Sequence, residues 1–327
     1  MSHPAVETRR RGAWAYHAVR QPLFGPVVAL TIALVVFSAI SPRFLTANNL
    51  SLVFQQSIVI GILAVGQTLV ILTAGIDLSI GAVTVLGTLV MAKVVADGNV
   101  VVAFATALVV CLAAGSLNGA LVTRLSLPPF IVTLGTFTII AAASQLYAGS
   151  RTYPVQPSAL TWLGTQLRFG SATVTYGVFL MLACYVVVWY MLSRTAWGKH
   201  VYAVGGNPEA ARLTGIKVRR VLFSVYAGTG FIAVLAAWAA LGRIPNADPN
   251  AFQNANLESI TAVVIGGTSM FGGRGGVMGT LVGTLIVGVL RNGLTLAGVD
   301  NLYQNIATGV LVILAVTVDQ FIRRRSQ

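Results

Sequence analysis

Long apolar stretches separated by short polar connections dominate the pattern of the chain. They lie near residues 23–40, 57–74, 78–96, 99–122, 128–148, 172–192, 221–241, 258–271, 276–296 and 302–322. Most of them approach the roughly 20 residues that an α-helix needs to cross the hydrocarbon core of a bilayer. The pattern therefore predicts an all-α protein, a polytopic transmembrane helical bundle of about ten spans.

Small residues inside these stretches are expected to serve helix packing. Gly275, Gly279 and Gly283 recur at every fourth position, which places them on one helix face. Cys111 and Cys184 both lie within apolar stretches, so we interpret them as small buried side chains. The stretch near 258–271 is short for a full crossing and is rich in glycine. We expect a broken or re-entrant segment there.

Composition agrees with a membrane environment. Of the 327 residues, 56% are hydrophobic and 9% are charged, whereas about a quarter are charged in soluble domains. The net charge of +13 would fit a nucleic-acid-binding protein only if the basic residues shared one folded surface, and here they lie between apolar stretches. We therefore expect the lipid bilayer, and no nucleic acid, as a partner.

The distribution of basic residues predicts the orientation. With ten spans and a cytoplasmic N-terminus, fifteen of the 21 lysine and arginine residues lie inside, which fits the positive-inside rule. An odd number of spans would place Arg323 to Arg325 outside. We thus predict cytoplasmic termini at 1–22 and 323–327, around a single transmembrane domain at 23–322 with a long cytoplasmic segment at 193–220.

The long cytoplasmic segment contains a predicted short helix. Gly205, Gly206, Asn207 and Pro208 are expected to form a turn, with Pro208 at the first helical position. The helix would run to about Leu213 and end at Gly215. A compact helix on two short arms would transmit force as a rigid body, although an ordinary solvated loop would look similar in sequence.

Polar residues within or between the apolar stretches are the candidates for a translocation pathway. Gly75 is expected to end the second helix, and Asp77 to cap the third through the amide of Ser79 or Ile80, with substrate contact as the alternative. Four amides are stranded in apolar sequence, and they either line the pathway or bond between helices. They are Gln67, Asn118, Gln145 and Asn292.

Catalytic chemistry has no support in the sequence. His3, His17 and His200 lie in tails or loops without metal-ligand spacing or a nucleophile nearby. The stretch from Gly267 to Arg274 loosely resembles a nucleotide loop but lacks its Lys-Ser/Thr ending. We expect no catalytic residue, no metal site and no cofactor in this chain, and an energy source elsewhere.

Three motifs carry a resemblance to a known family. They are GGNPEAARLTGI at 205–216, TAGIDLSIGAV at 73–83 and ITAVVIGGTSMFGGRGGVMGTLVGTL at 260–285. In order and spacing they resemble the membrane permeases of ATP-binding cassette importers, in particular the ribose-type monosaccharide permeases, which are related to branched-chain amino-acid permeases. The resemblance extends from Pro42 to Asp319. Glu258 departs from it, because an aspartate is expected at that position.

The resemblance implies a function and a set of partners. The chain would form, with a second permease subunit, the pathway for a monosaccharide such as ribose across a bacterial-type inner membrane. Two ATPase subunits would dock on the segment from Gly205 to Gly215, and an external solute-binding protein would deliver the sugar. The docking residues would be Gly205, Gly206, Asn207, Pro208, Glu209, Ala210, Ala211 and Gly215. Alternative cargoes are branched-chain amino acids, nucleosides or a sugar-like signal molecule, and another class is an ATP-independent transporter or channel.

Overall fold

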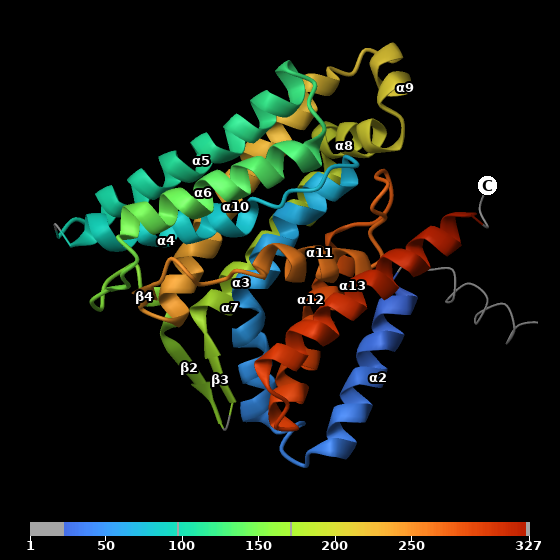
Figure 1. The fold of residues 1–327 in the computed structure, drawn as a ribbon. Helices are drawn as coiled ribbons and strands as arrows, with labels where there is room; N and C mark the ends of the chain where they lie inside the picture. The colour runs from blue at the N-terminus through green and yellow to red at the C-terminus, as the bar shows by residue number, and fades with distance from the viewer. Residues whose placement is uncertain (1–22, 97, 171, 325–327) are drawn as a thin grey trace, which may run out of the picture.

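The computed structural model describes residues 23–96, 98–170 and 172–324, and most of the chain is helical (Figure 1). The predicted N-terminal tail and residues 325–327 lie outside the described residues. The α-helices are α2 (Phe24–Ile40), α3 (Ala47–Leu72), α4 (Ile80–Val95), α5 (Val100–Arg124), α6 (Pro129–Ala148), α7 (Tyr176–Arg194), α8 (Ala196–Gly206), α9 (Pro208–Leu213), α10 (Val218–Arg243), α11 (Ala255–Ile265), α12 (Val277–Leu296) and α13 (Asn301–Arg324).

Six helices in the described part of the chain are long and apolar enough to cross a membrane, namely α3, α5, α6, α7, α10 and α12. Shorter apolar helical stretches occur in α2, α4, α11 and α13. Each of the ten predicted segments therefore contains an apolar helix, and the mostly helical membrane bundle is confirmed. The number of complete crossings stays a prediction.

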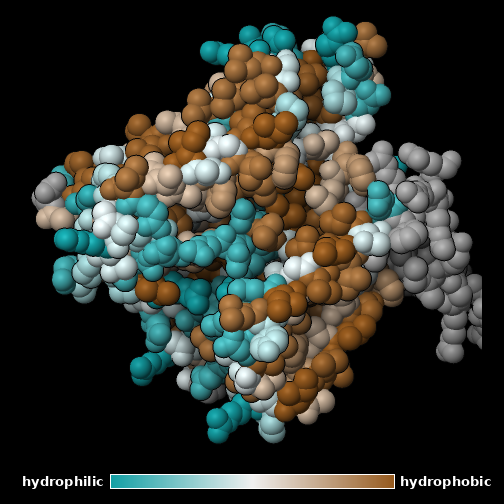
Figure 2. All heavy atoms as spheres, in the orientation of Figure 1, coloured by the Kyte–Doolittle hydropathy of each residue, from teal (hydrophilic) through white to brown (hydrophobic). Residues whose placement is uncertain are grey.

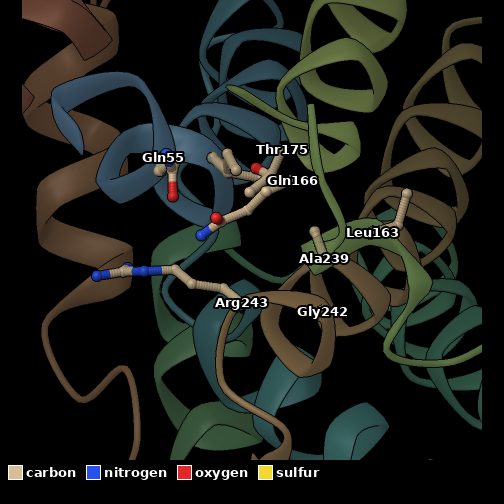
Figure 3. Close-up of a pocket in the computed structure, with 9 residues that line it drawn as sticks. Gln55, Leu163, Gln166, Thr175, Ala239, Gly242 and Arg243 are labelled. Carbon is tan, nitrogen blue, oxygen red and sulfur yellow. The ribbon is translucent and has the colours of Figure 1, made fainter. Parts of the chain in front are cut away.

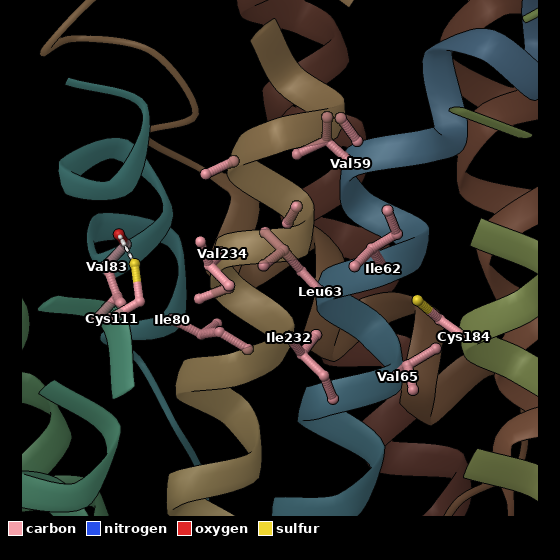
Figure 4. Packing of buried hydrophobic residues seen from close by; sticks show 14 of the residues in the cluster. Val59, Ile62, Leu63, Val65, Ile80, Val83, Cys111, Cys184, Ile232 and Val234 are labelled. Carbon is pink, nitrogen blue, oxygen red and sulfur yellow. Dashed lines mark hydrogen bonds between the residues drawn. The ribbon is translucent and has the colours of Figure 1, made fainter. Parts of the chain in front are cut away.

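Helix α3 lies at the centre of the bundle. In its most apolar window 89% of the residues are buried, against 22% in the corresponding windows of α5 and α6. Ile62 and Leu63 of α3 lie beside Ile232 and Val234 of α10 in the main apolar cluster (Figure 4). Apolar side chains also cover the outer surface along α2 and α13 (Figure 2), as expected where a helix faces lipid.

Small residues allow two helix pairs to approach closely, as the glycine spacing predicted. A methyl group built on Gly115 of α5 would collide with backbone atoms of α10, and one on Gly283 of α12 would collide with the Ala262 carbonyl of α11. Such backbone contacts favour association of helices in a bilayer. Cys111 and Cys184 are buried and unpaired, which confirms their interpretation as packing residues.

Helix α11 is a broken segment, in agreement with its glycine content. It has 11 residues, so it extends about 16 Å and cannot cross the roughly 30 Å hydrocarbon core alone. Irregular backbone follows it from Gly266 to Gly276, with positive φ at Gly267, Gly272, Gly273 and Gly275. Part of this backbone bonds to the bundle, since Gly273 donates a hydrogen bond to the carbonyl of Leu72.

A small antiparallel hairpin precedes α7. Strand β2 (Gln166–Phe169) pairs with β3 (Ala172–Thr175), so the prediction of a helix from residue 172 was wrong by four residues. The β-branched Thr-Val-Thr run pairs with a neighbouring strand before the helix begins. The two-residue strands β1 (Tyr153–Pro154) and β4 (Asn246–Ala247) form a second antiparallel pair. Because β3 and α8 adjoin opposite ends of α7, we call these two ends of the molecule the hairpin end and the α8–α9 end.

Candidate functional site

The α8–α9 end contains the short helix that the sequence predicted. Helix α9 spans Pro208–Leu213, and Gly215 follows it at φ +87°, the left-handed conformation that commonly ends a helix. The Asn207 side chain accepts a hydrogen bond from the Ala210 amide at 3.0 Å, which caps the helix start. The predicted turn at Gly205 and Gly206 was wrong. Both residues are the last of α8, and the reversal occurs at the extended residue Asn207.

One face of α9 is exposed and carries both charge and an apolar side chain. Glu209 and Arg212 form an ion pair at 3.2 Å, with 76% and 69% of their side chains exposed. Such a pair contributes little to stability in water. Leu213 at the end of the helix is 82% exposed. The opposite residue, Ala211, is buried against the bundle. Helix α9 therefore exposes a small surface with Glu209, Arg212 and Leu213, while Ala211 packs its other face against the bundle.

The end of α8 packs directly on two irregular segments of the bundle. A methyl group on Gly205 would collide with the carbonyl oxygen of Leu72, and it would lie 2.8 Å from the amide of Gly273. That amide donates to the same Leu72 carbonyl at 2.9 Å. We call this meeting point of Leu72–Ala74, Gly205–Gly206 and Gly272–Gly273 the glycine junction. It joins all three sequence motifs, which lie far apart along the chain.

Two further hydrogen bonds hold α8 in place. The Tyr202 hydroxyl donates to the carbonyl of Gly275 at 2.9 Å, and the Trp197 indole donates to the Ser224 hydroxyl of α10 at 2.8 Å. Burial raises the pKa of Tyr202, so its hydroxyl stays protonated as a donor at neutral pH. Helix α8 is therefore tied both to α10 and to the irregular segment after α11.

Asp77 lies in the loop between α3 and α4, residues 73–79, which we call the Asp77 loop. Its Oδ1 atom accepts hydrogen bonds from the Ser79 amide at 2.8 Å and from the Ser79 hydroxyl at 2.7 Å, while its Oδ2 accepts from Thr229 of α10 at 3.3 Å. The bond to the Ser79 amide is the predicted cap. Asp77 is 1% exposed, so no open solvent path reaches it in this conformation.

The end of α3 differs from expectation. The helix ends at Leu72, and Ala74 takes the left-handed conformation at φ +59° that we assigned to a glycine. Gly75 is needed for a different reason. A methyl group there would lie 2.7 Å from the Tyr226 hydroxyl of α10. The small residue thus permits a close approach between the loop and α10.

Three of the five predicted pathway residues meet at the Asp77 loop. In the amide orientation that satisfies both groups, Gln67 donates to the Asp77 carbonyl at 3.0 Å and accepts from the Asp77 amide at 3.3 Å. Asn118 donates to the Ser79 hydroxyl at 2.8 Å. Both amides are essentially buried. Their observed contacts are those of the interhelical alternative, and a role in the pathway stays a prediction.

The Asp77 loop also binds helices on other sides. The Ile76 carbonyl accepts from Thr133 of α6 at 2.9 Å, and the Leu78 carbonyl accepts from Asn256 of α11 at 3.1 Å. Since buried backbone groups need partners, these side chains fix the loop among helices that surround it. A displacement of the loop would be felt in α6, α10 and α11.

The other two predicted residues lie apart from this loop. Gln145 of α6 donates to Asn250 at 2.8 Å, in the connection before α11. Asn292 of α12 accepts from Asn49 of α3 at 2.9 Å and is buried. Each joins two segments of the chain. The structure therefore does not gather the five candidates into one polar channel.

Sequence reasoning missed the partner of Glu258 and the polar groups of the hairpin end. Glu258 is buried in α11 and forms an ion pair with Arg291 of α12 at 2.6 Å. Gln55, Gln166, Thr175 and Arg243 share a cavity described below. A signal existed only for the ion pair, because a carboxylate at membrane depth calls for a cationic partner.

Comparison with known proteins places this geometry in a family. A family model described as the permease component of the branched-chain amino acid transport system matches residues 49–316. The chain is 47% identical to the fructose import permease protein of Rhizobium meliloti, over 93% of this chain and 86% of that protein. It is 39% identical to the ribose import permease protein of Escherichia coli K12, over 90% and 92%.

The D-allose transport system permease protein of Escherichia coli K12 is 34% identical, with 92% of both chains covered. No solved structure matches the chain significantly. The relatives are transport permeases, and together with six membrane-length helices they indicate a multi-pass protein of the inner membrane. The chain therefore belongs to the family of permease components of transport systems, within which it resembles the sugar import permeases of the ATP-binding cassette class.

Proposed function

We propose that the chain forms the transmembrane pathway of an ATP-driven importer for a monosaccharide such as fructose, ribose or a related sugar. It works as a pair of permease subunits with no cofactor of its own. Two cytoplasmic ATPase subunits hydrolyse ATP, and an external solute-binding protein delivers the sugar. Two facts about the relatives support this function. Their names describe sugar transport, and the similarity covers most of this chain and of each relative.

The observation that carries the mechanism is the glycine junction. Helix α9 presents an exposed face for an ATPase subunit, and α8 transfers its position through backbone contact to Leu72 and Gly273. Both contacted segments are breaks between helices, where a small displacement changes the angle of the following helix. ATP-driven movement of α9 thus alters the Asp77 loop and the segment between α11 and α12 together.

The mechanism places the α8–α9 end in the cytoplasm and the hairpin end outside. The exposed basic residues support this placement, because Arg194, Lys199 and Arg212 lie at the α8–α9 end. Ten crossings with both termini cytoplasmic agree with it. The short helix α11 then enters the membrane without completing a crossing by itself.

The cargo is a neutral sugar and not an amino acid. A zwitterionic amino acid needs a carboxylate partner for its ammonium group. No carboxylate lines the cavity at the hairpin end among the described residues, and the nearby Glu258 is paired with Arg291. Amide, hydroxyl and guanidinium groups instead supply exchangeable hydrogen bonds, which suit a polyhydroxylated solute that must be released.

Charge reversal at α9 tests the coupling assignment. In cells that also express a partner ATPase and solute-binding protein, Glu209→Arg should abolish at least 90% of radiolabelled fructose uptake at an unchanged membrane level. Copurification of the ATPase should fall in parallel. Unchanged uptake would contradict the assignment, and uptake by the wild-type chain alone in proteoliposomes would establish an ATP-independent transporter instead.

The charge-swapped double variant is the matched control. Glu209→Arg with Arg212→Glu re-forms the exposed ion pair within α9 in the opposite order. If Glu209 served only the local helix, the double variant would regain uptake. Docking on a partner requires the carboxylate at its own position, so we expect the double variant to stay defective.

A further inference from the structure

A small polar cavity lies at the hairpin end of the molecule, where α3, the hairpin and the end of α10 meet (Figure 3). Its volume is about 70 Å³, which corresponds to roughly two waters at their liquid volume. The polar lining groups are Gln55, Gln166, Thr175 and Arg243, and Leu163 and Ala239 contribute an apolar side. In Figure 3 the amide ends of Gln55 and Gln166 lie near each other, and the Arg243 side chain extends past them on the side away from Leu163 and Ala239.

The hydroxyl of Thr175 has no hydrogen-bond partner among the described residues, although only 6% of the residue is exposed. Thr175 precedes the first turn of α7, but its side chain makes no capping bond there. Leaving a buried hydroxyl unpaired is unfavourable, because it has given up its bonds to water without replacing them. Since it lines the cavity, a group that enters the cavity is positioned to supply the missing bond.

Gln55 and Arg243 also keep bonding capacity for an occupant. The Gln55 amide nitrogen donates to the Thr173 carbonyl at 2.7 Å, and no described residue bonds to its oxygen. Arg243 makes no hydrogen bond or ion pair with the described residues. The carboxylate of Glu258 interacts with its charge electrostatically but is bonded to Arg291. A guanidinium group with free donors is well suited to adjacent oxygen atoms.

We propose that this cavity is a contact site for the hydroxyl groups of the neutral sugar as it enters the pathway. Thr175 and Gln55 offer atoms that accept or donate, and Gln166 and Arg243 add donors at the exposed rim. The cavity takes part of a sugar and not a whole one, so the contact is weak and exchangeable. This inference rests on the proposed function and names the residues that meet its cargo.

The test exploits the fact that Thr175 has no internal partner to lose. Thr175→Val replaces the unpaired hydroxyl by a methyl group of nearly equal size, so thermal stability should not fall and the membrane level should be unchanged. The KM for uptake of radiolabelled D-fructose or D-ribose by the complete transporter should rise at least fivefold. Thr175→Ser keeps the hydroxyl and should remain near wild type. Thr165→Val, an exposed threonine outside the cavity in the same segment, should also remain so.

Arg243→Gln is a second, independent test of the cavity as a sugar contact site. It replaces Thr175→Val if that variant does not reach the membrane. It should raise the KM for both sugars with maximal ATP hydrolysis retained. If Thr175→Val and Arg243→Gln both keep the wild-type KM, the cavity holds water only and the proposal is wrong. If Thr175→Val and Thr175→Ser raise the KM equally, the hydroxyl does not contribute to sugar binding. If the wild-type transporter accumulates neither sugar, the proposed function fails first and the inference falls with it.

Discussion

The two ends of the molecule differ in what lies beside their close backbone contacts. At the α8–α9 end, backbone meets backbone at Gly205, Leu72 and Gly273, with no space for a methyl group. At the hairpin end, the backbones of Gly164 and Gly242 also touch, but beside them lies a cavity of about 70 Å³ that is lined by residues of α3 and α10 and by the unpaired buried hydroxyl of Thr175. Close backbone contact transmits displacement because packed interiors resist compression. An open polar cavity transmits little, but it can exchange water for a solute.

The difference assigns a separate task to each end. The glycine junction has the properties of a mechanical link, and the cavity has those of a receiving site. The Asp77 loop begins at the glycine junction and is bonded to helices on several sides through Asp77, Ile76 and Leu78. A pathway subunit needs both properties at once, since energy arrives on one side of the membrane and cargo on the other.

Accessibility from the two sides of the membrane should show the largest contrast. Gln166→Cys at the hairpin end should react with a membrane-impermeant maleimide in intact cells, whereas Leu213→Cys on α9 should react only after the membrane is opened. The native Cys111 and Cys184 are buried and give little background. Labelling of Leu213→Cys in intact cells would show that the α8–α9 end lies outside. It would then contradict the assignment of the mechanical link to the cytoplasmic side.

A single methyl group at the junction should have the next largest effect. Gly205→Ala places a Cβ against the Leu72 carbonyl and should destabilise the folded protein by about 1–3 kcal/mol, because overpacking forces backbone shifts. Gly206→Ala is the matched control, since a Cβ there meets nothing within 4 Å. Thermal unfolding of both purified variants measures the contrast. Equal stability would mean that the junction is not tightly packed.

The smallest effect is expected for Asp77→Asn in the Asp77 loop. Asp77→Asn retains an acceptor for the Ser79 amide and should lower stability by less than about 1 kcal/mol. Asp77→Ala removes the acceptor of the buried Ser79 amide and hydroxyl and should lower stability by about 1–3 kcal/mol. Thermal unfolding and sugar uptake check both. Severe loss of uptake in a stable Asp77→Asn protein would show that the charge itself serves transport.

Much of the fold was predictable because membrane helices are encoded locally. Apolar length alone located the helical segments, and glycine content located the break after α11. The start of α3 was predicted ten residues too late, at 57 instead of Ala47, because its first turns contain Asn48, Asn49 and Gln55. A capping signal was available there. Thr46 accepts a hydrogen bond from the Asn49 amide at 3.4 Å.

The candidate sites were predictable only in part, because they depend on contacts between distant segments. The motif residues around Pro208 follow local helix rules, and α9 has the predicted bounds. That Gly205 meets Leu72 and Gly273 depends on tertiary packing, which no local pattern encodes. Thr175 likewise gains its significance from a missing partner, which only the arrangement of its neighbours can reveal.

The most direct test of communication between the two ends is the labelling rate of Gln166→Cys in the complete transporter, with and without ATP. If movement of α9 passes through the glycine junction to the hairpin end, ATP should change the rate at least threefold. The change should disappear when Glu209→Arg is added. An equal rate with and without ATP, in a transporter that still imports sugar, would contradict the account.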